Sequence, residues 1–506
     1  MQAQNFTLYD MIDQNAERYA DRLALIDDAG SYTFMDFSQR VDALAAGIGQ
    51  LSVSKGDCIC ILSQNSTSYV ELYGACAKLG TVAYPINWRL TPEEIERVIE
   101  RAKPRMMIVD EASLDFVSDW PTTKSTIPYW YKFGDASVSG FALLSSLYLP
   151  NQHIKTDVVK ADDPFAVIST AAVDVIPRGA VLTHTNVLVA NLQSMACMGL
   201  GSSDRNLLFL PLYHIAALNS AFSIMHAGGA NVVMTRFDAQ RAVQLIDQHQ
   251  VTTITSFPPV LSSILDAAQM AGSRLPSLTH VSGLEGPDII ERLHSETSAQ
   301  FWSGFGQTET SGFITLQRAA ENPGSAGRVT PFNRVKLVDD YDRDVPIGTP
   351  GEILVRGPMV FQGYYDQPEE TAHTFRDGWH HTGDVGRFDQ AGYLYYVKRK
   401  AEKELIKPGG ENVYPAEVEA VIMEIDQVTA VCVFGMADAQ WGEAIKAVVE
   451  TAAGDSLSEE QVISHVGSRI ARFKRPKSVI FVESLPKSED GAVDRDAVKG
   501  EWGQIA

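Results

Sequence analysis

Apolar residues in the first half of the chain alternate between short unbroken runs and longer amphipathic stretches. Residues 57–65 (DCICILSQN) and 81–87 (TVAYPIN) are short runs that predict buried strands. Residues 68–80 (SYVELYGACAKLG) lie between them and predict a helix that ends at Gly80. A helix is expected again at 238–250, with a strand on either side. Strands that alternate with helices predict a parallel sheet with helices on its faces.

The pattern changes after about residue 330, where short strands with turn residues between them predict a mainly β subdomain at 334–357 and 392–400. The last part of the chain returns to a mixture of strands and helices. We therefore predict an α/β fold with a large N-terminal domain, residues 1–398, built from parallel-rich sheets flanked by helices plus a β subdomain. A small, mobile α+β C-terminal domain is expected at 399–506.

Composition narrows the functional classes. The chain has 506 residues, 45% of them apolar, which predicts two or three packed units. Its formal charge of −21 disfavours nucleic acid as a partner. The five cysteines have no spacing typical of a zinc or redox site, and the N-terminus lacks the pattern of a secretion signal, so we expect a cytoplasmic protein.

One long stretch, residues 206–235, contains no charged residue. Pro211 and the Gly228-Gly229 pair interrupt it, which is untypical of a membrane helix. We expect a strand, a loop and a buried helix of a large core here, and no membrane span.

Three segments identify a family. GFGQTETSG (304–312), HTGDVGRFDQAGYLYYVKRK (381–400) and ELIKPGGENVYPAEVE (404–419) resemble the adenylate-forming (AMP-binding) superfamily, in its acyl- and aryl-CoA synthetase branch. The resemblance covers nearly the whole chain in the family's order. It implies an AMP-forming ligase that converts a carboxylic acid and ATP, with Mg²⁺, to an acyl-adenylate and then transfers the acyl group to coenzyme A.

The resemblance also implies roles for individual residues. Phe305 would stack near adenine, Asp384 would accept hydrogen bonds from the ribose hydroxyls, and Glu309 would hold Mg²⁺. Glu285, in SGLEG, would line either the adenine slot or the acyl pocket. The other expected nucleotide contacts are Thr170, Arg178, Gly304, Gly306, Gln307, Thr308, Tyr396 and Arg399. Taken without the family, GFGQTE is also compatible with a glycine-rich turn before a helix.

The other implied roles concern the acid pocket, the hinge and the thioester step. His214, in LPLYHIAALN, would lie beside the incoming carboxylate, although a lone histidine in apolar sequence is also compatible with a core position. Lys400 matches the hinge between the two domains. The expected loop for the thiol of coenzyme A contains Lys407, Gly409, Gly410 and Glu411.

The chain departs from the family pattern at two places. Residues 170–179 (TAAVDVIPRG) lack the inner glycines and threonines that would wrap phosphates, so this loop has either lost that role or grips ATP with fewer donors, Arg178 included. In PKSEDGAVDR (486–495), Ala492 stands where the family has a catalytic lysine. An engineered change, a natural lineage that uses another cation and a degenerate enzyme all remain compatible with Ala492.

The leading hypothesis is an acyl-CoA synthetase whose adenylation step is impaired by Ala492. Alternatives are a non-catalytic homologue that binds nucleotide or acyl-CoA, an adenylation enzyme that loads a carrier protein and, more distantly, a luciferase-like oxygenase. The substrate is expected to be a medium-chain or aromatic acid. A dicarboxylic acid is disfavoured because no cation is evident near the pocket segments. A homodimer is compatible with the family.

Overall fold

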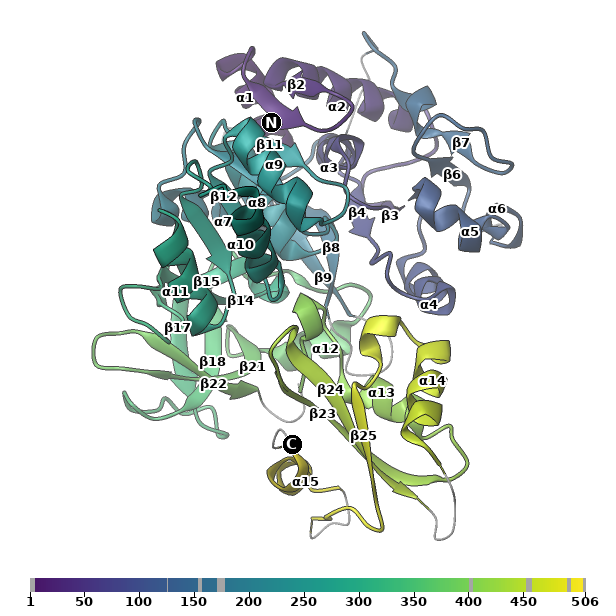
Figure 1. The fold of residues 1–506 in the computed structure, drawn as a ribbon. Helices are drawn as coiled ribbons and strands as arrows, with labels where there is room; N and C mark the ends of the chain where they lie inside the picture. The colour runs from purple at the N-terminus through teal and green to yellow at the C-terminus, as the bar shows by residue number, and fades with distance from the viewer. Residues whose placement is uncertain are drawn as a thin grey trace.

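The computed structural model describes residues 5–124, 126–152, 157–170, 178–399, 404–451, 457–488 and 493–503. Two large sheets and a smaller antiparallel sheet form the body of the molecule, and a three-stranded sheet follows in the C-terminal part, from residue 404 onward (Figure 1). The α/β class with parallel-rich sheets, a β subdomain and a small α+β C-terminal part is confirmed.

The first large sheet has nine strands, and its central strands are parallel. Neighbouring strands pair in a defined register, in which, for example, Val281 lies opposite Phe301. In spatial order the strands are β16 (Arg328–Val329), β15 (Gly312–Arg318), β14 (Gln300–Gln307), β13 (His280–Gly283), β12 (Thr253–Ser256), β10 (Arg205–Leu208), β11 (Ala230–Val233), β1 (Leu23–Ile26) and β2 (Ser31–Thr33).

The second large sheet has eight strands, and Ile59 of its centre pairs with Ala83 on one side and Met106 on the other. In spatial order the strands are β19 (Gly363–Tyr364), β9 (Arg178–Thr183), β8 (Pro164–Thr170), β4 (Val82–Pro85), β3 (Cys58–Leu62), β5 (Met106–Val109), β6 (Tyr129–Lys132) and β7 (Ala142–Leu143).

Helices fill the layer between the two sheets and cover their outer faces. The largest core cluster joins apolar residues of both sheets to the inner helices α1 (Leu8–Arg18), α2 (Phe34–Gly49), α3 (Thr67–Leu79), α7 (His184–Met198) and α8 (Ile215–His226). The outer face of the nine-stranded sheet carries α9 (Ala239–His249), α10 (Val260–Ala271) and α11 (Pro287–Glu296). The outer face of the eight-stranded sheet carries α4 (Pro92–Ala102). Short helices of the body include α5 (Leu114–Val117), α6 (Trp120–Thr123), α12 (Pro368–Thr374), η1 (Glu111–Ser113) and η2 (Leu144–Leu147).

The β subdomain is antiparallel and packs on the end of β14. Its apolar side chains, among them Ile353 and Leu394, share a small core with Phe305. The strands are β17 (Arg334–Val338), β18 (Gly351–Arg356), β20 (Phe375–Arg376), β21 (Trp379–Phe388) and β22 (Leu394–Arg399).

The C-terminal part is a three-stranded sheet with helices on both faces. Its strands are β23 (Val428–Asp438), β24 (Gly442–Thr451) and β25 (Ser478–Val482). One face packs against α13 (Pro415–Ile422) and α14 (Glu459–Arg469). The other face packs against α15 (Arg495–Trp502), and short helices η5 (Pro408–Gly410) and η6 (Arg472–Lys474) lie in the connections.

Local sequence signals account for many of these boundaries. Helix α3 begins after Ser66, whose hydroxyl accepts the backbone N–H of Tyr69, and ends at Gly80 with φ 71°, as predicted. The uncharged stretch 206–235 folds as β10, a loop, α8 and β11, as expected. Among the described residues we find no helix that is both long and apolar enough to cross a membrane.

Candidate active site

A cavity of about 1510 Å³ lies where the C-terminal part meets the body. Helices α7 and α8, the ends of β12, β13 and β14, and C-terminal loops at 405–414 and 440–443 line it. It brings together these predicted site residues: Thr170, Arg178, His214, Glu285, Gly304, Phe305, Gly306, Gln307, Thr308, Glu309, Tyr396, Arg399, Lys407, Gly409, Gly410 and Glu411.

The glycines of GFGQTE are required by strand packing. An added Cβ at Gly304 would lie 2.4 Å from the carbonyl oxygen of Thr315, and one at Gly306 would lie 2.1 Å from that of Gly312. Strand β15 approaches too closely for any side chain at either position. The need for glycine here is therefore set by the fold, whatever the cavity binds.

Two aromatic rings lie in the cavity wall formed by the end of β14 and the β subdomain. Phe305 and Tyr396 stack with ring centroids 6.2 Å apart. Phe305 is only 8% exposed and belongs to the core of the β subdomain, whereas Tyr396 is 49% exposed. Tyr396 therefore offers the larger surface for a planar ring, with Phe305 behind it.

Asp384, the predicted ribose ligand, is fully buried behind the cavity wall. Its oxygens accept hydrogen bonds from Arg399 at 2.7 and 3.1 Å, and also from Gln307 and the Tyr396 hydroxyl. Burial of Arg399 lowers the pKa of its guanidinium, but Asp384 and Tyr396 together outweigh burial and the net shift is upward. In this arrangement Asp384 holds Arg399 and Gln307 against the wall.

Glu309, the predicted magnesium ligand, follows β14 in the short helix η3 (Thr308–Thr310). The Tyr364 hydroxyl donates a hydrogen bond to its Oε1 at 3.0 Å. Arg178 lies 5.1 Å above the Tyr364 ring and forms an ion pair with Glu370. One carboxylate and one guanidinium thus face the cavity from neighbouring positions, both fixed through Tyr364.

The predicted thiol loop enters the cavity from the C-terminal part. Gly409 and Gly410 have φ of 60° and 84°, in the left-handed region that favours glycine. A Cβ at Gly409 would lie 2.9 Å from the Trp441 ring, and one at Gly410 would lie 3.3 Å from Phe257. The loop backbone therefore packs closely between segments of the two parts.

Glu411 anchors this loop to the body. Its carboxylate accepts hydrogen bonds from Asn87 at 3.0 Å and Tyr213 at 3.1 Å, forms an ion pair with Arg89, and lies 3.5 Å from Nε2 of His214. Burial raises the pKa of Glu411, but His214 and Arg89 outweigh burial and bring the pKa to about 2. The carboxylate is therefore ionised throughout the neutral range.

The pKa of Glu285 shifts in the opposite direction. Burial raises its pKa to about 7, although the Ser256 hydroxyl donates to its Oε1 at 2.8 Å and opposes the shift. The Glu285 carboxyl therefore carries a proton through part of the neutral range. The structure places it in the wall formed by the loops after β12 and β13.

Three predicted positions lie outside the described residues: the altered loop at 171–177, Lys400 and Ala492. The ends of that loop, Thr170 and Arg178, face each other as partners of β8 and β9. On either side of Ala492, Lys487 and Val493 form an isolated bridge on the C-terminal part, and neither lines the cavity.

The sequence prediction missed several residues of the site. Asn87 and Arg89 lie in the loop after β4, Tyr213 precedes His214, and Tyr364 forms the edge strand β19. Each meets its partner only through tertiary contact. Arg89 and Glu411, for example, are 322 positions apart. No family motif contains Asn87, Arg89 or Tyr364, and Tyr213 lies in LPLYHIAALN, where nothing local signals its contact with Glu411.

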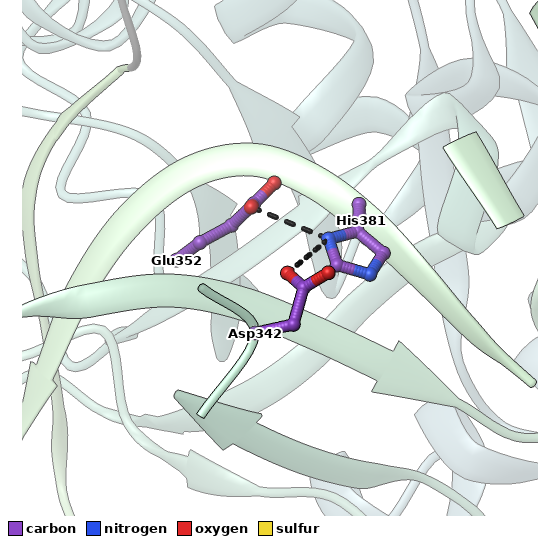
Figure 2. A group of neighbouring side chains, drawn as sticks. All are labelled: Asp342, Glu352 and His381. Carbon is purple, nitrogen blue, oxygen red and sulfur yellow. Dashed lines mark hydrogen bonds and ion pairs between the residues drawn. The ribbon is translucent and has the colours of Figure 1, made fainter. Parts of the chain in front are cut away.

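A second group of ionisable residues lies in the β subdomain (Figure 2). Nδ1 of His381 is 3.3 Å from Glu352 and 3.9 Å from Asp342. The same nitrogen contacts the Arg376 guanidinium at 2.6 Å, and Arg376 also lies 3.5 Å from Asp342. Because this cation already offsets the carboxylates, the group is an ion network that supports the turn before Asp384, where Glu352 accepts the Gly383 N–H at 2.9 Å.

Family comparisons agree with this architecture. The profile described as AMP-binding enzyme matches residues 12–365, and that of the AMP-binding enzyme C-terminal domain matches residues 417–492. Feruloyl-CoA synthase from Amycolatopsis sp is 32% identical over 496 residues, covering 93% of this chain and 94% of the relative. Indoleacetate–CoA ligase from Aromatoleum aromaticum is 30% identical over 505 residues, covering 97% of each.

Two solved structures of o-succinylbenzoate CoA synthetase from Bacillus subtilis differ in their similarity to this chain. Each is 25% identical and covers 98% of both chains. The double mutant bound with the product analogue OSB-NCoA gives a TM-score of 0.85. The complex with the acyl-adenylate intermediate OSB-AMP gives 0.69. The arrangement of this chain is therefore nearer to the product-analogue complex.

Proposed function

The chain belongs to the AMP-binding enzyme family, among the AMP-forming acid–thiol ligases, and from this premise we propose that it makes the coenzyme A thioester of a neutral medium-chain or aromatic monocarboxylic acid. In the first step the carboxylate oxygen attacks the α-phosphorus of ATP, and pyrophosphate leaves. In the second the sulfur of coenzyme A attacks the acyl carbon, AMP leaves, and the thiol proton is released.

The observation that carries this proposal is the loop Gly409–Glu411 within the cavity. Glu411 is fixed by Arg89 and His214, so the glycine backbone is held in the cavity lining beside Trp441 and Phe257. The thiol arm of coenzyme A would enter the cavity along this backbone. The higher similarity to a product-analogue complex supports the same assignment, in which this chain is arranged for thioester formation.

The nucleotide would lie against the wall made by Tyr396 and the end of β14. Tyr396 would stack on the base, Thr308 would bond the phosphates, and Arg399, held by Asp384, would reach the ribose. Magnesium typically uses one or two carboxylates and completes its shell with phosphate and water. Glu309 fits that donor set, because it places a single carboxylate on the cavity wall beside Arg178.

The lining between α7 and α8 supports the choice of acid. Its side chains are small or apolar and neutral, and they include Ala190, Ser194, Met198, Ala216, Ser220 and Ile224. The basic residues of the described lining are Arg89, Arg178, Arg399, Lys407 and two histidines, and each of the arginines has a carboxylate partner. A second substrate carboxylate would find no unpaired arginine, and burial lowers the pKa of Lys407 and so disfavours its charged form, so we propose a monocarboxylic acid. The relatives named for ferulate and indoleacetate support the aromatic option.

We further propose that the C-terminal part is a lid that turns between the two steps about a hinge near Lys400. In the orientation described here, Glu411 occupies the cavity, while the bridge beside Ala492 lies away from it. Adenylation in this family's scheme would require the segment with Ala492 to approach instead. Because alanine lacks the ammonium, we expect this first step to be slow.

A second candidate follows from the two departures in sequence. A chain without the phosphate-wrapping glycines at 171–177 and with Ala492 could bind nucleotide or acyl-CoA without turnover. The intact loop Gly409–Glu411 favours the enzyme over a protein that binds nucleotide alone, because nucleotide binding needs no site for the thiol of coenzyme A.

The deciding experiment measures pyrophosphate release with ATP and Mg²⁺ for this chain and for Ala492→Lys. The acids are ferulate, indoleacetate, octanoate and palmitate. We expect slow release that rises about 10²–10³-fold in the lysine variant. Nucleotide binding by calorimetry without release from either variant, together with no thioester from a supplied acyl-adenylate and coenzyme A, would favour the binding protein.

A further inference from the structure

A buried ion cluster joins the C-terminal part to the body outside the cavity. Nζ of Lys474, at the end of η6, lies 2.6 Å from Glu94 and 2.7 Å from Glu417. The three side chains are 4%, 6% and 5% exposed. Glu94 belongs to α4 of the body, whereas Lys474 and Glu417 belong to the C-terminal part, and Figure 1 shows α4 beside this junction.

Each glutamate is held by a backbone hydrogen bond at the start of its own helix, in addition to its bond with Lys474. Glu94 is the third residue of α4 and accepts the Thr91 N–H at 2.8 Å, and Glu417 is the third residue of α13 and accepts the Tyr414 N–H at 3.0 Å. These capping boxes hold both carboxylates at helix N-termini, where the helix dipole favours negative charge. One ammonium can therefore serve two carboxylates in a dry environment.

Two hydrogen bonds of this cluster join the C-terminal part to the body, and both are accepted by Glu94. Besides the lysine, the Ala471 N–H donates to Oε2 of Glu94 at 3.2 Å. Both oxygens of Glu94 thus have partners on the C-terminal part, and both bonds require one relative orientation. If the C-terminal part turned, Lys474 and Glu417 would move together, and Glu94 would stay with the body.

The cluster is also connected to the thiol loop. Helix α13 begins directly after Tyr414, which lines the cavity, and the loop Gly409–Glu411 lies a few residues earlier. Fixing the first turn of α13 against α4 therefore fixes where this loop enters the body. Glu411 makes the second anchor, inside the cavity.

We propose that Lys474 is a positioning residue for the thioester step, holding the lid through Glu94 in the orientation that places Gly409–Glu411 in the cavity. This inference rests on the proposed function. Stability alone is a poor explanation of the cluster, because buried ion pairs are often replaceable by apolar residues without loss. A charged cluster that is satisfied in one orientation instead favours that orientation over others.

Glu94→Gln tests this proposal with little disturbance of the fold. Glutamine keeps an oxygen for the Thr91 cap but removes the charge that faces Lys474. Glu404→Gln is the matched control, because it removes a largely buried charge whose ion pairs, with Arg495 and Lys499, lie within the C-terminal part. Lys446→Met is a control for loss of a buried lysine, since Lys446 bonds the Trp502 carbonyl at 2.7 Å, and among the described residues no partner of its ammonium lies in the body.

The first readout is hydrogen exchange of residues 404–417, which needs no substrate. Glu94→Gln should speed exchange in this segment about tenfold or more, as expected for loss of a charge-assisted hydrogen bond. Lys446→Met should leave it unchanged. Unchanged exchange in Glu94→Gln overturns the proposal whatever the enzyme does, so this readout separates its failure from failure of the proposed function.

The second readout separates the two steps, using the most active acid of the panel. In Glu94→Gln, thioester formation from the supplied acyl-adenylate and coenzyme A should slow about tenfold, while pyrophosphate release without coenzyme A stays constant. Glu404→Gln should keep the ratio of the two rates. Equal losses in both steps for Glu94→Gln, or the same ratio change in Glu404→Gln, would show a merely structural role and overturn the proposal.

Discussion

Replacing Glu411 by glutamine should slow the thioester step and leave adenylation nearly unchanged. The pKa of Glu411 falls from 4.5 to about 2 when the carboxylate sits beside His214 and Arg89. This difference of about 2.5 units corresponds to roughly 3.4 kcal/mol, at about 1.36 kcal/mol per unit. Arg89 is 39% exposed, so solvent screens part of the pair, and we expect about 1–2 kcal/mol, or about 5- to 30-fold.

The sign of the pH dependence follows from the lowered pKa. Proton binding to Glu411 is weaker in the docked lid than in the free chain, so docking is favoured above about pH 4.5 and lost as the pH falls toward 2. The glutamine variant should lack this dependence. Docking can be followed across that range by hydrogen exchange of residues 404–417, under conditions where the body remains folded.

The assay is a single turnover of acyl-adenylate with excess coenzyme A, compared with pyrophosphate release in its absence. Glu404→Gln is the matched control, because Glu404 forms its ion pairs with Arg495 and Lys499 inside the C-terminal part. Our reasoning would be refuted by equal losses in the two steps, or by an effect of Glu404→Gln as large as that of Glu411→Gln.

Three further substitutions test other parts of the site. Tyr396→Ala should raise the KM for ATP about 2- to 10-fold through lost stacking, and an unchanged KM would place the base elsewhere. Glu285→Gln should tighten ATP binding at pH 8 but not at pH 6, because the carboxyl ionises above about 7 and adds negative charge near the nucleotide; the KM for ATP at both pH values checks this. Its raised folded pKa also means that stability is lost as the pH rises from about 4.5 through 7, so the glutamine variant should melt higher at pH 8. Gly409→Ala should slow only the coenzyme A step, because its Cβ would meet the Trp441 ring at 2.9 Å and alanine resists the left-handed φ; single turnover measures it.

Much of the fold was predictable because its signals are local. A cap such as Ser66, a stop such as Gly80 and the period of apolar residues each act within one or two turns of chain. The motif GFGQTE was found for the same reason. Its glycines Gly304 and Gly306 make room for β15. The motif locates the site, but the sequence does not reveal which neighbour excludes a side chain.

The rest depended on contacts between distant segments. Tyr364 lies on an edge strand of two residues, too short to predict, yet its hydroxyl holds Glu309 and its ring lies under Arg178. The family motifs predicted a ribose contact for both Asp384 and Arg399, but the complete burial of Asp384 follows from packing of the β subdomain against β14. Burial and partner choice are properties of the assembled fold.

The pairing of charges explains how an acidic chain keeps cations at this site. With a net charge of −21, unpaired arginines in a partly dry cavity would be poorly solvated and attracted to many competing carboxylates. Each arginine of the described lining instead has a defined acidic partner: Glu411 for Arg89, Glu370 for Arg178 and Asp384 for Arg399. Two of these partners belong to the body, but Glu411 belongs to the C-terminal part. If Glu411 moved out of the cavity with the C-terminal part, Arg89 and His214 would both lose their carboxylate partner. The position of the C-terminal part therefore sets how much positive charge the cavity offers to an anion.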